Sequence, residues 1–383
     1  MLTRIPNSEY QDRARRVQQE LTRRKLDGLL AFATECEPAN ARYLSDYWPS
    51  FETTAVLVPR TGEPSLLIGP ESRTFATATS RLSQLYQLIE LRESSQPAYP
   101  NARLDTWEAV LGKHRIRRLG IAGYAMLPLP VHQRLAAVLG PDSLVDADDL
   151  LLQLRMVKSA NEVKLHRQAY RLAERGLERV LSVAKPGMTE VQVAAEAEYA
   201  MLSTGADCTG YPIWCCSGPN TNQAISRPTH RKIRNGEVIQ LCCGARFGGY
   251  ASSIGRPFVL GKMSRELRRL LEVGLAAEEL TIATLRGGIL ASEVAKKVHA
   301  YIREQGYGEY ILYGPAHGVG LMECEYPFIE TSLDMELQPN MMFNIDIFLG
   351  KGNVGLRFED GVRITANGVE ELSSHRREVL NLR

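Results

Sequence analysis

The feature that most constrains the fold is a change of pattern along the chain near residue 155. Before it, short apolar runs such as LDGLLAFA and TTAVLVP alternate with helical patterns around 103–113 and 130–139. Such alternation is typical of an α/β layer. From 148 to 185 the pattern is almost continuously helical, and a second helix follows Thr189. Strand patterns and two further long helices, at 263–286 and 290–305, complete the chain.

A chain of 383 residues exceeds the size at which one hydrophobic core stops growing, so two domains are expected. The change of pattern places the boundary near 155–160, which predicts domains of 1–156 and 157–383. Apolar residues make up 44% and charged residues 23%, the balance of an ordinary globular protein.

Charge and cysteine content exclude several classes of protein. The net charge is +2, and no strongly basic face stands out, so no nucleic-acid partner is expected. The seven cysteines are scattered and odd in number, which fits a reducing compartment better than a disulfide framework. The chain shows no apolar signal core and no stretch approaching a membrane span. We therefore expect a cytoplasmic protein without membrane contact.

Six segments of the second half carry a recognisable order of motifs. In chain order they are LRMVKSANEVKLHRQA, SGPNTNQA, GGYASSIGRPF, HGVGLMECEYP, LQPNMMFNIDIF and GLRFEDGVRIT. Together they resemble the creatinase/prolidase/methionine-aminopeptidase group, peptidase family M24. The resemblance implies an α+β "pita-bread" C-terminal domain preceded by a creatinase-type α/β N-terminal domain.

The family's metal-dependent members hold two divalent ions with Asp, Asp, His, Glu and Glu. The matching positions here are Cys242, Ser253, His317, Asp346 and Glu359, and Cys324 replaces the motif's second histidine. Divalent pairs need several carboxylate ligands, and a thiol and a hydroxyl cannot replace bridging carboxylates. We therefore expect no metal and no other cofactor.

The hypothesis that follows is a metal-independent hydrolase of a C–N bond, as creatinase is within this group. His317 would transfer protons, while Glu325, Asp346 and Glu359 would bind substrate or activate water. Two desolvated carboxylates repel each other, and a small cationic or zwitterionic nitrogen compound would relieve that repulsion. Creatine itself is not expected, because creatinase's catalytic histidine corresponds to Ile225.

Further residues are candidates for binding the substrate. Tyr211 and Trp214 would wall the pocket, and Arg357 could hold a carboxylate or pair with the nearby acids; Arg256 could do the same. The remaining candidates are Tyr250, Cys242, Ser253 and Cys324.

Three alternatives stay open. A single zinc ion could be bound by Cys242, His317, Asp346 and Glu359, as in a mononuclear Xaa-Pro aminopeptidase or dipeptidase. A thiol, Cys242 or Cys324, could act as a nucleophile beside His317. The chain could also be a catalytically inactive relative that serves as a binding protein.

The N-terminal segment ECEPANARYLSDYW resembles the part of creatinase-type homodimers that reaches the active site of the other subunit. The resemblance implies a homodimer in which the N-terminal domain of one chain lies near the pocket of the other. Tyr47 and Trp48 are the expected wall residues.

Overall fold

The protein, described here by a computed structural model over residues 4–382, forms two compact units. One spans Ile5–Arg155 and the other begins at Met156. No helix among the described residues is long and apolar enough to cross a membrane.

The N-terminal unit is built on one six-stranded sheet in the order β4-β3-β2-β1-β5-β6. Every residue of β1 and β2 is buried, as their continuous apolar runs predict. β1 pairs antiparallel with β2 and parallel with β5. The strands are β1 (Gly28–Ala33), β2 (Thr54–Pro59), β3 (Ser65–Ile68), β4 (Gln84–Gln87), β5 (Leu119–Ala122) and β6 (Leu144–Asp146).

Helices pack on this sheet and close its core. Trp107, Leu30 and Phe32 belong to that core and are fully buried. The helices are α1 (Asn7–Arg24), α2 (Ala39–Ser45), α3 (Arg73–Thr79), α4 (Trp107–Lys113), α5 (Leu129–Leu139) and α6 (Asp148–Met156). The predicted α/β architecture of this region is confirmed.

The C-terminal unit contains a large sheet whose main path is β14-β13-β15-β16-β12-β9-β8, with β17 and β18 paired to β16 and β12. A smaller sheet has the order β11-β10-β7. The strands are β7 (Cys208–Thr209), β8 (Trp214–Ser217), β9 (Val238–Cys243), β10 (Ala245–Phe247), β11 (Tyr250–Ala251), β12 (Ile254–Leu260), β13 (Ala316–Gly318), β14 (Glu325–Ile329), β15 (Met342–Lys351), β16 (Val354–Ile364), β17 (Val369–Glu371) and β18 (Leu380–Leu382).

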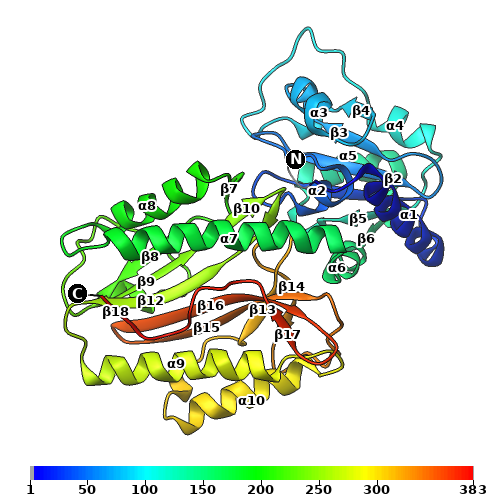
Figure 1. Ribbon diagram of the computed structural model, residues 1–383. Coiled ribbons are helices and arrows are strands. Elements are labelled where there is room, and N and C mark those ends of the chain that lie inside the picture. Colours follow the sequence, from blue (N-terminus) through cyan, green and yellow to red (C-terminus); the bar gives the residue numbers. More distant parts are fainter. Residues whose placement is uncertain (1–3, 383) are drawn as a thin grey trace. The chain divides into compact units, whose positions relative to one another are not determined.

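Four long helices cover the large sheet. Figure 1 shows α7 (Ala160–Val183) and α8 (Glu190–Ser203) on one side of it, with α9 (Arg265–Thr284) and α10 (Ala291–Glu304) on the other. Ser159 and Thr189 each begin a helix with a capping box, and the helix expected after Thr189 is present. The layered α+β architecture agrees with the predicted pita-bread fold.

The register of β15 and β16 decides which side chains face the helices and which face away. Phe343, Ile345 and Ile347 of β15 belong to the hydrophobic core that also includes residues of α9 and α10. Because side chains alternate along a strand, Asp346 must point to the opposite face. Asp346 pairs directly with Glu359 across the two strands. The sheet therefore places these two acids side by side.

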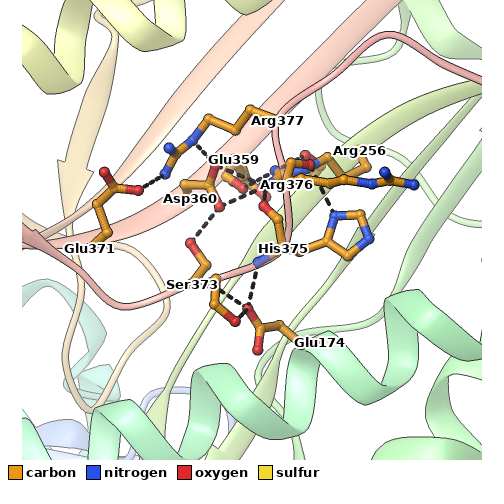
Figure 2. Close-up of polar contacts among 11 residues, drawn as sticks. Glu174, Arg256, Glu359, Asp360, Glu371, Ser373, His375, Arg376 and Arg377 are labelled. Atoms are coloured by element: carbon orange, nitrogen blue, oxygen red, sulfur yellow. Dashed lines mark hydrogen bonds and ion pairs between the residues drawn. The ribbon is translucent and has the colours of Figure 1, made fainter.

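A buried ionic network holds the backbone next to Glu359, as Figure 2 shows. Arg256 of β12 and Asp360 of β16 are both fully buried, and Arg256 Nη2 lies 2.9 Å from each Asp360 oxygen. Arg256 Nη1 also donates to the carbonyl oxygen of Glu359 at 3.0 Å. Arg377 donates to Asp360 at 2.7 Å. Arg256 was expected to hold a substrate carboxylate or to pair with the acids of the site, and it pairs instead with Asp360.

Candidate active site

The C-terminal unit contains a cavity of about 380 Å³ on the face that carries Asp346 and Glu359. Its wall is largely aromatic and aliphatic, and its polar groups are concentrated on β13, β15, β16 and the loop that follows β13. The lining residues are Tyr211, Trp214, Ala224, Ile225, Tyr313, Gly314, Ala316, His317, Glu323, Cys324, Phe328, Ile329, Glu330, Asp346, Arg357 and Glu359.

His317 lies on β13, and the hydrogen bonds of its imidazole ring fix its orientation. Nδ1 lies 3.0 Å from the carbonyl oxygen of Gly318, which can only accept, so Nδ1 carries a proton. Nε2 lies 3.5 Å from Oε1 of Glu323. Burial alone would lower the pKa of His317, but Glu323, Cys324 and Asp346 together raise it well above its ordinary value. The imidazole is therefore held in its charged form.

Glu323 is a site residue that the sequence motifs did not indicate. Its carboxylate Oε1 accepts a hydrogen bond of 3.0 Å from the amide of Asn344, which is fully buried. The hydroxyl of Tyr170, on α7, donates to the amide oxygen of the same Asn344. Glu323 is thus oriented toward His317 from two different elements of the fold. The one signal in the sequence was an acid directly before Cys324, inside the histidine motif.

Glu359 sits at the end of a directed chain of hydrogen bonds. The Ser253 hydroxyl donates to Glu359 Oε2 at 2.5 Å and lies 2.7 Å from the hydroxyl of Tyr211. Because Ser253 has one proton to give, Tyr211 donates to Ser253. Burial and the charge of Asp346 raise the pKa of Glu359 to about 8, against the opposing effects of Arg357 and Ser253. This carboxyl group therefore changes its charge near physiological pH.

Asp346 differs from Glu359 because its charge is paired. Arg357 Nε lies 3.2 Å from Asp346 Oδ1, and the Tyr313 hydroxyl donates to Oδ2 at 2.8 Å. The guanidinium of Arg357 also stacks on the Trp214 ring, 4.6 Å from its centroid. It donates to the carbonyl oxygen of Ala224 at 2.8 Å. The two acids thus have different environments: Asp346 is paired with a cation, and Glu359 accepts from the neutral hydroxyl of Ser253.

Four predicted residues lie outside the lining of the cavity, and three of them, Glu325, Tyr250 and Cys242, are buried in contact with other parts of the C-terminal unit. Glu325 is buried, accepts from the backbone of Met322 at 2.8 Å and lies 3.8 Å from Lys158 Nζ. Tyr250 is buried and donates to Glu162 at 2.9 Å. Cys242 is fully buried within β9. Cys242 lies opposite Gly255, which in turn lies opposite Glu359, so its side chain is on the same face of the sheet as Glu359 but is covered.

Other predictions agree with the placement of the side chains. Tyr211, Trp214, Cys324 and Arg357 line the cavity together with His317, Asp346 and Glu359. Ser253 does not line it but supports Glu359 and Tyr211 from behind.

The ligand positions of the resembled family do not fit a pair of metal ions. Burial raises the pKa of the Cys242 thiol well above its ordinary value, and its sulfur is not among the donor atoms that converge in the described residues. Ser253 is a neutral donor to Glu359. The described residues bring together donor atoms of His317, Asp346 and Glu359, which lie within 4.8 Å of one another. Such a set fits one cation at most.

Comparison with known families agrees with this architecture. Residues 164–366 match Metallopeptidase family M24, and residues 13–157 match the Creatinase/Prolidase N-terminal domain.

Individual relatives are similar over most of the chain. A Xaa-Pro dipeptidase of Pyrococcus horikoshii is 27% identical over 80% of this chain and 87% of the relative. The uncharacterized peptidase YqhT of Bacillus subtilis is 28% identical over 70% of this chain and 76% of the relative. Among solved structures, the X-Pro aminopeptidase of Thermotoga maritima superposes with a TM-score of 0.85 at 23% identity, covering 96% of this chain and 99% of that one.

Proposed function

Because the chain belongs to metallopeptidase family M24 and is accordingly a hydrolase that acts on C–N bonds, we propose that it works without a metal ion on a small cationic or zwitterionic nitrogen compound. The observation that carries this proposal is that Glu359 and His317 line the same cavity. Their environments raise both pKa values, which provides a base and an acid from side chains alone.

Glu359 is the general base in this proposal. A carboxylate with a pKa of about 8 is a stronger base than an ordinary glutamate, and it accepts a proton from the attacking water. The Ser253 hydroxyl donates a hydrogen bond to Oε2 of Glu359. The other carboxylate oxygen, Oε1, is therefore the one that accepts the proton of the water. Glu359 is buried, and the apolar wall of the cavity limits competition from bulk water.

His317 is the general acid. Its charged imidazole has Nδ1 bonded to a backbone carbonyl, so the proton on Nε2 is the one that can be given to the leaving nitrogen. Glu323, at 3.5 Å from Nε2, stabilises the charge until the transfer occurs. Protonation of the leaving nitrogen is needed because a neutral amine leaves far more readily than an amide anion.

The charges in the lining support the substrate class. Four carboxylates line the cavity, those of Glu323, Glu330, Asp346 and Glu359, against the cationic Arg357 and His317. A ligand with a positive nitrogen would reduce the repulsion among these acids. The aromatic rings of Tyr211, Trp214 and Phe328 would pack against its apolar part and favour a cation.

One observation favours a second candidate, a peptidase that uses a single metal ion. The donor atoms of His317, Asp346 and Glu359 lie close enough to hold one cation, and a similar protein is named as a Xaa-Pro dipeptidase. Asp346, however, already pairs with Arg357, which reduces the negative charge available to a cation.

A turnover screen tests the proposal. Protein treated with a chelator is incubated with amidines, guanidines, cyclic amides and Xaa-Pro dipeptides, and the released amine is quantified. We expect turnover of a non-peptide compound that His317→Ala abolishes and that the exposed His230→Ala leaves unchanged. Hydrolysis of Xaa-Pro dipeptides alone, appearing only after a divalent metal ion is returned to the protein, would favour the second candidate. Binding without turnover by any compound would mean that the chain is a binding protein.

A further inference from the structure

Two of the four carboxylates in the cavity are already paired with the two cations that line it. Oδ1 of Asp346 lies 3.2 Å from Nε of Arg357. Oε1 of Glu323 lies 3.5 Å from Nε2 of His317. Each pair joins one negative and one positive charge, so neither pair adds to the net charge of the cavity.

The remaining carboxylates, those of Glu330 and Glu359, give the cavity an excess of negative charge. Within residues 4–382, no cationic side chain lies within ion-pair distance of either carboxylate. Glu359 accepts a hydrogen bond of 2.5 Å from Ser253 and is the proposed base. Of the lining acids that the structure describes, Glu330 is therefore the one left to hold a positive group of the substrate.

Glu330 directly follows β14 and is accompanied by accessible aromatic rings. Phe328 and Glu330 are exposed while Ile329 between them is buried, so the side chains of 328 and 330 lie on the same side of the chain. The backbone of Glu330 lies beside Gly314, where an added Cβ would be 3.3 Å from the Cα of Glu330. Tyr313, the neighbour of Gly314, also lines the cavity. A carboxylate accompanied by aromatic rings favours a cation.

A ligand carboxylate would find neither lining cation free. The side chain of Arg357 is 3% exposed, and its Nη2 donates to the Tyr313 hydroxyl at 2.5 Å. The rings of Trp214 and Phe348 have their centroids 4.6 Å and 5.3 Å from the guanidinium carbon. The side chain of His317 is 10% exposed, and its Nε2 already faces an acid. Either cation would have to give up a present partner to bind a carboxylate.

We propose that Glu330 binds the positive group of the substrate, and that the cavity takes cations that carry no carboxylate in preference to zwitterions. Amidines, guanidines and amines are such cations. The inference rests on the proposed function and narrows its substrate class. It also counts against Xaa-Pro dipeptides, because their C-terminal carboxylate would meet the excess negative charge of the cavity, and like charges brought together at a binding site are unfavourable.

Calorimetric titration of the intact, chelator-treated protein with three compounds of similar shape tests the substrate class. Benzamidine is a cation, benzamide is its neutral analogue, and 4-carboxybenzamidine is a zwitterion. We expect benzamidine to bind at least about tenfold more tightly than either of the others. Equal affinity for benzamidine and either analogue would overturn the inference, and so would the absence of saturable binding of benzamidine.

Two variants test the assignment to Glu330, whose exposed side chain can be replaced without disturbing a core. Glu330→Gln should weaken benzamidine binding about fivefold, as for the loss of a partly exposed ion pair, and leave benzamide binding unchanged. Glu330→Lys should shift the preference toward 4-carboxybenzamidine. Glu304→Gln, an exposed acid of α10 outside the cavity, is the control. Unchanged affinities in both Glu330 variants, with folding confirmed by circular dichroism, would overturn the assignment.

Binding is measured without turnover, so the inference and the proposed function fail separately. If the screen finds hydrolysis of a cation and Glu330→Gln leaves its KM unchanged, the role of Glu330 is wrong while metal-independent hydrolysis stands. If the cation preference is observed and is lost in Glu330→Gln, but no compound is hydrolysed, the proposed function fails and Glu330 is retained as a ligand-binding residue.

Discussion

The carboxylate of Glu323 lies 3.5 Å from Nε2 of His317, and the amide of Asn344 holds it there with a hydrogen bond of 3.0 Å. This pair links the loop that follows β13 to the buried strand itself. It supplies the negative charge that the site needs if His317 is to remain protonated in a buried position.

Glu323→Gln should lower the pKa of His317, because the variant keeps the shape of the side chain and loses its charge. We expect kcat/KM to fall by roughly tenfold or more, as for the loss of a group that orients a catalytic histidine. The alkaline limb of the pH profile, which reports loss of the proton from His317, should move to lower pH. The exposed Glu304→Gln is the control. An unchanged alkaline limb in Glu323→Gln would contradict the pairing.

The acidic limb of the pH profile should report Glu359. As a general base this group must be deprotonated, so kcat/KM should rise with pH through about 8. Ser253→Ala removes a hydrogen bond that favours the carboxylate, so it should move the same limb to higher pH. An acidic limb with its midpoint near 4.5, the ordinary pKa of a glutamate, would show that Glu359 is not the base with the raised pKa.

Glu359→Gln should stabilise the protein while abolishing turnover. The folded-state pKa of Glu359 is about 8, raised from an ordinary value of 4.5, so the folded state binds the proton more tightly than the unfolded state. This tighter proton binding stabilises the folded state fully below the unfolded pKa of 4.5, and the stabilisation is lost as pH rises through the folded pKa of about 8. Thermal unfolding at pH 5 and pH 9 should therefore show a Tm advantage for the variant that is larger at pH 9. An advantage that does not grow with pH would contradict the raised pKa.

Arg256→Ala should destabilise the C-terminal unit by about 3 kcal/mol, because it leaves the buried carboxylate of Asp360 with Arg377 as its one remaining cationic partner among the described residues. Arg376, whose side chain is 79% exposed in its pair with Glu378, is the matched control, and Arg376→Ala should change the free energy of unfolding little. Urea unfolding monitored by tryptophan fluorescence gives both values. Equal effects of the two substitutions would show that burial of the network in Figure 2 adds no energy.

Much of the fold could be predicted from the sequence because its signals are local and ordered. The helix after Thr189, the apolar run of β1, and six motifs in a fixed order each correspond to an observed element. The placement of Asp346 beside Glu359 also follows from motif matching, since both lie on long regular strands whose alternation is easy to read.

The cavity was harder to predict because it depends on loops and on the pairing of distant strands. Glu325 carries the motif, but the turn after β13 brings Glu323 to His317 and directs Glu325 toward Lys158. Cys242 lies in a strand of the site, yet its burial depends on packing across β8, β9 and β12. Neither outcome is contained in the residue types or their spacing.

The most direct test of the central claim is the activity of the protein as a function of its metal content. The protein is purified without a histidine tag, stripped with chelator, and divided into samples with no addition and with zinc, manganese or iron. Metal per chain is measured by elemental mass spectrometry, and hydrolysis of the compound found in the screen is measured on the same samples. We predict full kcat/KM in the sample that holds less than about a tenth of an equivalent of metal, and no gain on addition. Activity that appears only with one bound ion per chain, and that rises in proportion to its content, would contradict the account.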